Sequence, residues 1–364
     1  MSMYVRNCWY VAAWSHEVEA AGLLGRTILN EPILFMRTEA GQVVALDNRC
    51  CHRGAPLSRG RREGDCVRCM YHGLKFDAQG RCVEIPGQDD IPPQARVRTY
   101  PVAERNGWIF VWMGEAARAD EALLPDNSAA ADPGYRYKPG YMRYDVDYLL
   151  IADNLLDFSH LTYVHQATLG GSERIAQTRP QIERLPRGLR VVRRVRDVPP
   201  APYHRKFADF PETIDRWFDY EFLVPGVLLM HSGGKPPGRA WDDFEGALHM
   251  KSCQAITPEN DRSTHYFFMQ AHGFALDDES VTDAIAKSLV QAFEEDRETI
   301  RAQQAMLDHG PTRFVPIRAD AAVNQFRKLL MAMCEEEAAD RSAAVMPVAA
   351  HGSAPTRLTR LPTS

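Results

Sequence analysis

Short apolar segments separated by turn residues fill residues 1–115. Segments rich in β-branched and aromatic side chains, which are typical of strands, occur at 27–29, 33–36, 42–46 and 108–112. Turns such as Ala40-Gly41 and Asn106-Gly107 separate them. Many short strands with regular turns predict an antiparallel all-β domain.

A second domain is predicted after residues 116–134, a stretch without sustained periodicity that we expect to be a linker. Strand-like segments recur within residues 135–340, for example at 141–147, 189–193 and 265–269. Residues 278–309 have the pattern of a long amphipathic helix. Residues 341–364, rich in Ala, Ser, Thr and Pro, are expected to form a disordered tail.

One carboxylate interrupts the apolar face of the predicted helix. The face runs through Ile285, Leu289, Phe293, Ile300 and Leu307. Asp296 lies in the middle of it, where a charge is costly unless it is paired or coordinates a metal. Asp296 is therefore either a metal ligand or half of a buried salt bridge to an arginine. Glu294 and Glu295 fall off this face and are predicted to be solvated.

The composition is that of a globular protein and gives no sign of a nucleic-acid-binding or membrane-spanning one. A chain of 364 residues with 45% hydrophobic and 25% charged residues is that of an ordinary soluble globular protein. Its net charge of -5 gives no reason to expect nucleic acid as a partner. No apolar stretch resembles a signal peptide or a membrane span, so we expect a cytoplasmic protein whose eight cysteines are not a disulfide framework.

Two of these cysteines belong to a four-ligand pattern. Cys50 and His52 form a Cys-x-His pair, and Cys69 and His72 form a Cys-x-x-His pair, with sixteen residues between the two pairs. Two cysteines and two histidines are the ligands of a Rieske [2Fe–2S] cluster, in which both histidines bind the same iron. Zinc also accepts this ligand set, but its ligand pairs usually have two to four residues between them. The single residue between Cys50 and His52 favours the cluster.

A second group of metal-ligand side chains lies at 152–165. Asn154, Asp157 and His160 are spaced to share one face of a predicted helix. His165 lies roughly 140° further round an ideal helix, so the helix must bend or end between the two histidines if both bind one metal. With Asp296 they would complete the two-His-one-carboxylate set of non-haem Fe(II) oxygenases. Taken alone, two histidines at these positions would more often be hydrogen-bonded core residues than metal ligands.

The combined motifs resemble the oxygenase components of Rieske non-haem iron oxygenases, within the group that contains vanillate O-demethylase, toluenesulfonate methyl-monooxygenase and dicamba demethylase. The resemblance covers roughly residues 3–335 and is carried by residues 6–12, 50–53, 69–77, 154–165 and 293–297. Cys51 is a departure, because the wider family usually has proline there.

This resemblance implies a fold and a set of roles. The fold is α+β: a Rieske domain at 1–115, then a catalytic domain at 135–340 with an antiparallel sheet flanked by helices. The resemblance also implies a head-to-tail homotrimer in which Asp157 links His72 of a neighbouring chain to His160, with Asn154 close to the iron. Electrons are expected from a separate NAD(P)H-dependent reductase carrying a flavin and a ferredoxin-type cluster.

The implied reaction uses O2 to hydroxylate a methoxy or methyl group of a small aromatic, anionic substrate. The same metals could instead support ring hydroxylation or cis-dihydroxylation of an aromatic acid, and a Rieske electron carrier is the alternative from another class. We expect Met230, His231, His249 and Gln254 to line the pocket. His231, His249 or an arginine would receive the acid group.

Iron content separates an oxygenase from an electron carrier. We expect three iron atoms per chain, two in the cluster and one at His160, His165 and Asp296. Elemental analysis of freshly reconstituted protein measures this ratio. A carrier would hold only two.

Overall fold

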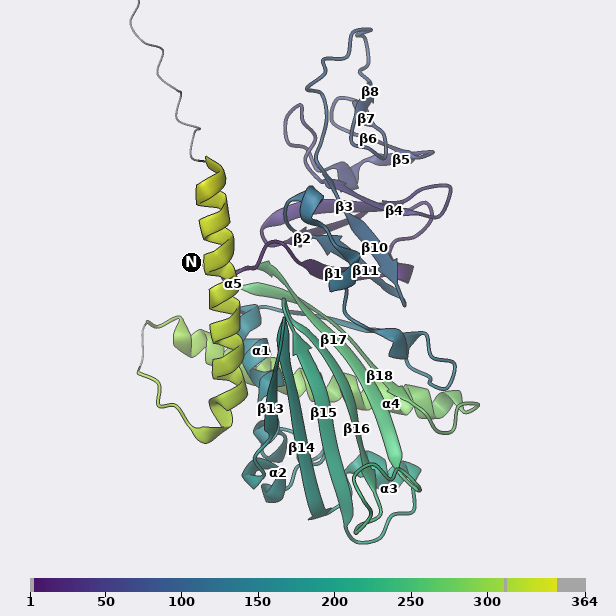
Figure 1. The fold of residues 1–364 in the computed structure, drawn as a ribbon. Helices are drawn as coiled ribbons and strands as arrows, with labels where there is room; N and C mark the ends of the chain where they lie inside the picture. Colours follow the sequence, from purple (N-terminus) through teal and green to yellow (C-terminus); the bar gives the residue numbers. More distant parts are fainter. Residues whose placement is uncertain (1–2, 311–312, 346–364) are drawn as a thin grey trace, which may run out of the picture.

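The computed structural model describes residues 3–310 and 313–345 and has the two predicted parts, an N-terminal all-β region and a C-terminal α+β region (Figure 1). The N-terminal strands form three small antiparallel sheets. The first contains β1 (Trp9–Trp14), β11 (Trp108–Trp112) and β10 (Val102–Arg105). The second contains β2 (Leu24–Ile28), β3 (Glu31–Arg37), β4 (Val43–Asp47) and β9 (Thr99–Tyr100). The third contains β5 (Arg61–Glu63), β6 (Cys66–Arg68), β7 (Lys75–Phe76) and β8 (Cys82–Glu84).

A seven-stranded antiparallel sheet dominates the C-terminal region, in the order β12-β18-β17-β16-β15-β14-β13. The strands are β12 (Gly140–Tyr144), β13 (Gln181–Leu185), β14 (Gly188–Val198), β15 (Ile214–Leu223), β16 (Val227–Lys235), β17 (Leu248–Asn260) and β18 (Ser263–His272). The helices are α1 (Tyr148–Leu156), α2 (Glu173–Gln177), α3 (Pro202–Phe207), α4 (Glu279–Leu307) and α5 (Ala321–Val345). Short 3-10 turns occur at Ser15–Glu17, Leu57–Arg59 and Arg318–Asp320.

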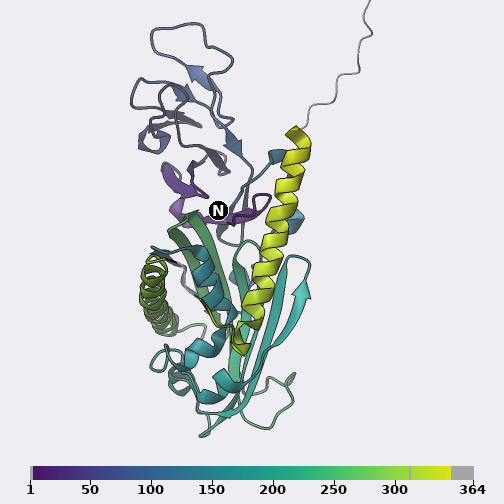
Figure 2. The same cartoon turned by 90° about the vertical axis from the view of Figure 1, so that its left-hand side faces the viewer.

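Helices α1, α4 and α5 share one hydrophobic core with one face of the large sheet (Figure 2). Phe293 of α4 packs on Phe268 with ring centroids 4.8 Å apart, and Phe326 of α5 packs on Phe222 at the same distance. The other face of the sheet packs against a second cluster that contains the four tryptophans of β1 and β11. The helical layer therefore lies on one side of the sheet and the N-terminal aromatic cluster on the other.

The segment predicted as a linker forms three 3-10 turns, η3 (Ala116–Arg118), η4 (Glu121–Leu123) and η5 (Ser128–Ala130). It packs against the second core, where Leu124 and Asn127 are buried. The predicted start of the tail at residue 341 is wrong, because α5 continues to Val345 through an alanine- and glutamate-rich stretch of high helix propensity. Residues 346–364 lie outside the described part of the chain.

Hydrogen bonds tie the N-terminal region to the β17–β18 hairpin. The backbone N–H groups of Leu29 and Asn30 donate to the carbonyls of Pro258 and Glu259, each at 2.9 Å. The Thr257 hydroxyl donates to the Val11 carbonyl at 2.7 Å and is fully buried. In Figure 1 the β5–β8 sheet lies at the end of the N-terminal region that is remote from the large sheet.

Replacing Thr257 with valine should destabilise the protein by about 1–3 kcal/mol, since it leaves a buried carbonyl without its donor while keeping the side-chain shape. Chemical denaturation measures the change. The matched control is Thr178→Val, whose lost hydrogen bond to the Arg174 carbonyl is exposed to solvent and should cost less than about 0.5 kcal/mol. If both variants lost the same free energy of unfolding, the Thr257 hydrogen bond would contribute no more to stability than a solvent-exposed one.

Candidate metal centres

The loop after β4 and the loop between β6 and β7 have the same backbone geometry. In each, the cysteine N–H donates to the carbonyl five residues later, and a glycine N–H four residues later donates back to the cysteine carbonyl, all at 2.8–2.9 Å. These glycines, Gly54 and Gly73, have φ values of +70° and +80°, which side chains with a Cβ rarely adopt. The repeated turn presents Cys50 and Cys69 in equivalent positions.

The four side chains of these loops separate into two pairs. Cys50 and Cys69 are buried, whereas His52 and His72 are exposed with ring centroids 4.6 Å apart. Burial raises the pKa of the Cys50 thiol to about 11, so a bound metal is needed to hold it as a thiolate. An inner thiol pair and an outer imidazole pair fit a cluster with two irons, one ligated by sulfur and one by nitrogen. A single zinc would draw all four ligand atoms to one point.

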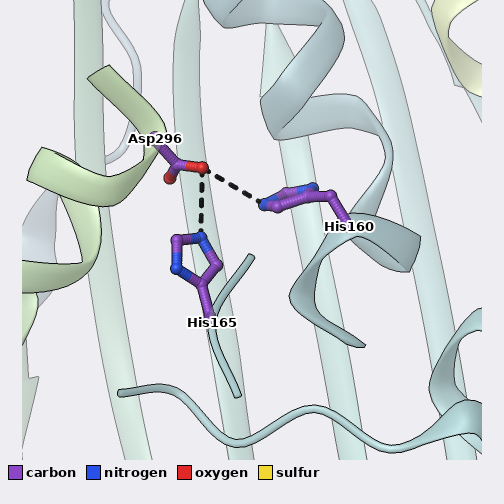
Figure 3. A group of neighbouring side chains, drawn as sticks. All are labelled: His160, His165 and Asp296. Carbon is purple, nitrogen blue, oxygen red and sulfur yellow. Dashed lines mark hydrogen bonds and ion pairs between the residues drawn. The ribbon is translucent and has the colours of Figure 1, made fainter. Parts of the chain in front are cut away.

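The second centre is a set of three side chains from two stretches of the chain, residues 158–165 and α4 (Figure 3). His160 belongs to η6 (Phe158–Thr162), His165 follows it in a turn, and Asp296 lies on α4. The Asp296 Oδ1 atom is 3.1 Å from His165 Nε2 and 3.7 Å from His160 Nε2. One ligand atom of each residue lies within 4.8 Å of the other two, which is close enough to hold one metal ion. Two imidazoles and one carboxylate fit Fe(II).

The helix that carries these ligands ends earlier than predicted. A single helix over 152–165 is wrong, because α1 stops at Leu156 and Asp157 adopts an extended backbone with φ -126° and ψ 95°. The Asp157 carboxylate accepts the Ser159 N–H at 2.9 Å and so caps η6. The chain breaks at Asp157, before His160, and η6 itself ends at Thr162, so the helical path does end between the two histidines as expected.

Hydrogen bonds to other side chains orient two of the three ligands. The Asn154 amide donates to Asp296 Oδ1 at 2.9 Å. His165 Nδ1 lies 2.8 Å from Glu295, which also accepts the Thr168 hydroxyl at 2.8 Å. Burial lowers the pKa of His165, but Asp296 and Glu295 outweigh it and the net pKa is raised. The prediction that Glu295 is solvated holds only in part: its side chain is 28% exposed, but its carboxylate is hydrogen-bonded to the loop carrying His165.

His160 is oriented by the backbone of Asp157 rather than by its side chain. Its Nδ1 atom lies 2.5 Å from the Asp157 carbonyl oxygen. The Asp157 carboxylate is bonded to Ser159 and lies 3.6 Å from the Arg193 guanidinium. Burial lowers the pKa of His160, which favours the neutral imidazole that a metal requires.

A cavity of about 260 Å³ opens beside the three ligands and is lined mostly by apolar side chains. Met230 and Gln254 line it, as predicted. His231 and His249 do not; they lie outside the cavity and face each other with ring centroids 5.5 Å apart. Successive residues of a strand point to opposite faces, so Met230 and Met250 enter the cavity while their neighbours His231 and His249 do not.

A Rieske-type cluster domain followed by a pocket with a two-His-one-carboxylate centre defines the class of Rieske non-haem iron oxygenases. The Rieske [2Fe-2S] domain family matches residues 8–101, and the vanillate O-demethylase oxygenase C-terminal domain family matches residues 144–336. The chain belongs to this vanillate O-demethylase-like family of oxygenases and is the oxygenase component of a Rieske aromatic monooxygenase, with a [2Fe–2S] cluster and a mononuclear iron as cofactors.

Relatives and solved structures agree with this assignment. The chain is 46% identical to the toluene-4-sulfonate monooxygenase system iron-sulfur subunit of Comamonas testosteroni, over 92% of this chain and 98% of that protein. It is 35% identical to the dicamba O-demethylase oxygenase component of Stenotrophomonas maltophilia, over 90% and 97%. The crystal structure of dicamba monooxygenase bound to dicamba superposes with a TM-score of 0.85 and 32% identity, over 92% and 99% of the two chains.

The relatives are components of multicomponent systems, which require a separate reductase. In the part of the chain that the structure describes, no helix has the length and apolarity needed to cross a membrane.

Glu295→Gln should weaken iron binding at the mononuclear site by roughly 10- to 100-fold, because a carboxylate behind a ligating histidine fixes its orientation and basicity. Titration of the apo site with Fe(II) measures the affinity. The matched control is Glu294→Gln, next in sequence but paired with Arg297 on the surface, which should bind iron like the wild type. Unchanged affinity in Glu295→Gln would contradict the role of Glu295.

Proposed function

We propose that this oxygenase hydroxylates a methyl or methoxy carbon of a small aromatic acid, and that His160, His165 and Asp296 hold the iron at which this occurs. The observation that carries the proposal is the convergence of these three side chains on the wall of a mostly apolar cavity. The iron, when bound, supplies open coordination positions at which O2 is activated next to the substrate.

The chain's own residues position the reactants. Asn154 donates to Asp296 and so restrains its carboxylate, while Glu295 does the same for the His165 ring. Phe158, Leu289 and Phe293 are buried side chains of the cavity wall and exclude water from the reacting carbon. The reaction consumes O2, two electrons and two protons, and yields water together with the hydroxylated carbon. A hydroxylated methyl group is an alcohol, whereas a hydroxylated methoxy group is a hemiacetal that releases formaldehyde and a phenol.

Cys50, His52, Cys69 and His72 would hold the [2Fe–2S] cluster, which would supply single-electron transfer. A separate NAD(P)H-dependent reductase with a flavin and a ferredoxin-type cluster delivers the electrons one at a time in the cytoplasm. Both histidines are exposed, His52 in the loop after β4 and His72 in the loop between β6 and β7. The β5–β8 sheet itself is remote from the large sheet of the same chain (Figure 1). This placement favours transfer to the iron of a neighbouring chain, and a head-to-tail homotrimer repeats the transfer around a closed ring.

Asp157 is the proposed link between neighbours. Its side chain is 21% exposed, and its backbone carbonyl already contacts His160. An exposed edge of its carboxylate can accept a hydrogen bond from His72 of the adjacent chain without breaking the Ser159 cap, because a carboxylate accepts several hydrogen bonds.

Product analysis tests the proposed reaction. With O2, NADH and a surrogate reductase, we expect formaldehyde from 4-methoxybenzoate or a benzylic alcohol from 4-methylbenzenesulfonate. A diol or a ring phenol as the main product, with the side group retained, would contradict the proposal.

Asp157→Asn should stop turnover while leaving the cluster and the mononuclear iron bound. Asparagine caps a helix as well as aspartate does, so the fold is kept, but the charged link is lost. The control is Ser159→Ala, which removes one partner of the carboxylate and should keep most activity. Product formation under single-turnover conditions, with the cluster reduced beforehand, is the measurement, and full activity in Asp157→Asn would defeat the link.

A further inference from the structure

Arg216 is a buried cation whose counterion is absent from the described part of the protein. It lies on β15, is 2% exposed and lines the cavity beside the mononuclear centre. Its two terminal nitrogens donate to the carbonyls of Gly170 and Leu169, at 2.5 and 3.3 Å. Its Nε atom is buried without a hydrogen-bond partner, and no carboxylate of residues 3–310 or 313–345 lies within ion-pair distance.

Other buried cations of the chain are better compensated. Arg193 donates to the Ile175 carbonyl and also faces the Asp157 carboxylate at 3.6 Å. The Lys235 ammonium reaches the carbonyls of Ala240 and Asp243. A buried guanidinium with an unused donor is costly unless an anion pairs with it. Arg216 is thus the cation of the cavity that most requires a ligand; Lys206, which also lines it, is exposed.

The position of Arg216 relative to the iron ligands follows from the sheet. Arg216 and Phe218 are two residues apart on β15 and point to the same face. The guanidinium lies 5.1 Å from the Phe218 ring centroid, and Phe218 packs on Phe158 at 5.6 Å. Phe158 in turn is 6.3 Å from the His160 ring. An aromatic wall therefore connects the cation at one end of the cavity with the metal ligands at the other.

We propose that Arg216 binds the acid group of the substrate, an aryl sulfonate or carboxylate, and so directs the opposite end of the ring to the iron. The planar fork of a guanidinium matches two oxygens of such a group, and the Phe158–Phe218 wall accommodates the ring. This inference rests on the proposed function, which states that a methyl or methoxy carbon of the substrate is the one hydroxylated. It assigns to Arg216 the binding of the acid group, which His231 and His249 cannot provide because they lie outside the cavity.

Arg216 also contacts the loop of an iron ligand, which the test must separate from substrate binding. Gly170, whose carbonyl accepts from Arg216, donates its own N–H to the His165 carbonyl at 2.9 Å. Each variant is therefore assayed first for iron content and for the cluster spectrum. Arg216→Lys keeps the charge without the fork, and Arg216→Met removes the charge at similar length.

Calorimetric titration of the iron-replete, oxygen-free oxygenase tests the proposal without any turnover. The probes are 4-methylbenzenesulfonate, 4-methylbenzoate and the neutral 4-methylbenzenesulfonamide. We expect Arg216→Met to weaken binding of the two acids by roughly 100-fold, which is a typical loss when one partner of a buried charge pair is removed. Binding of the neutral probe should weaken by less than about threefold, because it forms no such pair. Arg216→Lys should be intermediate for the acids. Lys206→Met, the matched control, should bind all three probes like the wild type.

Three binding results would overturn the assignment: a wild type that does not prefer acids to the neutral probe, equal weakening of all three probes in Arg216→Met, or acid binding lost in Lys206→Met instead. Loss of iron in both Arg216 variants would also overturn it and assign Arg216 to the His165 loop. A wild type that binds the acids through Arg216 but forms neither alcohol nor formaldehyde with a reductase would contradict the proposed function alone.

Discussion

A carboxylate inside an apolar helix face is the constraint on which the rest of the structure depends. Asp296 is 5% exposed, and its polar neighbours are two imidazoles and the Asn154 amide rather than a basic side chain with a permanent charge. Such a charge is stable when a cation neutralises it and its oxygens are fully hydrogen-bonded. The two histidines reach it because α1 stops at Asp157, and α4 is held in place because Phe293 packs on the sheet.

The cavity combines this negative end with a positive one. Asp296 and Glu295 surround the metal position, whereas Arg216 lies beyond the aromatic wall of Phe158 and Phe218. A substrate with an acid at one end of its ring meets complementary charge at Arg216 in only one orientation. Orientation in such a site thus follows from electrostatics at a distance from the reacting carbon, and the apolar walls near the iron need only exclude water.

The sequence predicted those features that depend on local spacing. The loop pattern around Cys50 and Cys69 and the break in the apolar stripe at Asp296 were both visible along the chain. Features that depend on which distant segment packs against a helix or strand could not be predicted from the sequence. Glu295 lies off the apolar stripe and is partly covered only because a distant loop folds over it. His231 and His249 lie outside the cavity because the pairing of a strand in the sheet, and not its own composition, decides which of its alternating residues face the cavity. Arg216 resembles many other arginines until its burial is known.

Cross-chain complementation tests most directly whether the two iron centres work in series through neighbouring chains. One chain would carry Cys69→Ser, which removes the cluster, and a second would carry Asp296→Ala, which removes the mononuclear iron. Each variant alone should be inactive. Co-assembly in equal amounts should restore about one quarter of the wild-type rate, because about one in four head-to-tail junctions joins an intact cluster to an intact iron site. Mixed assemblies that are isolated intact but remain inactive would contradict the account.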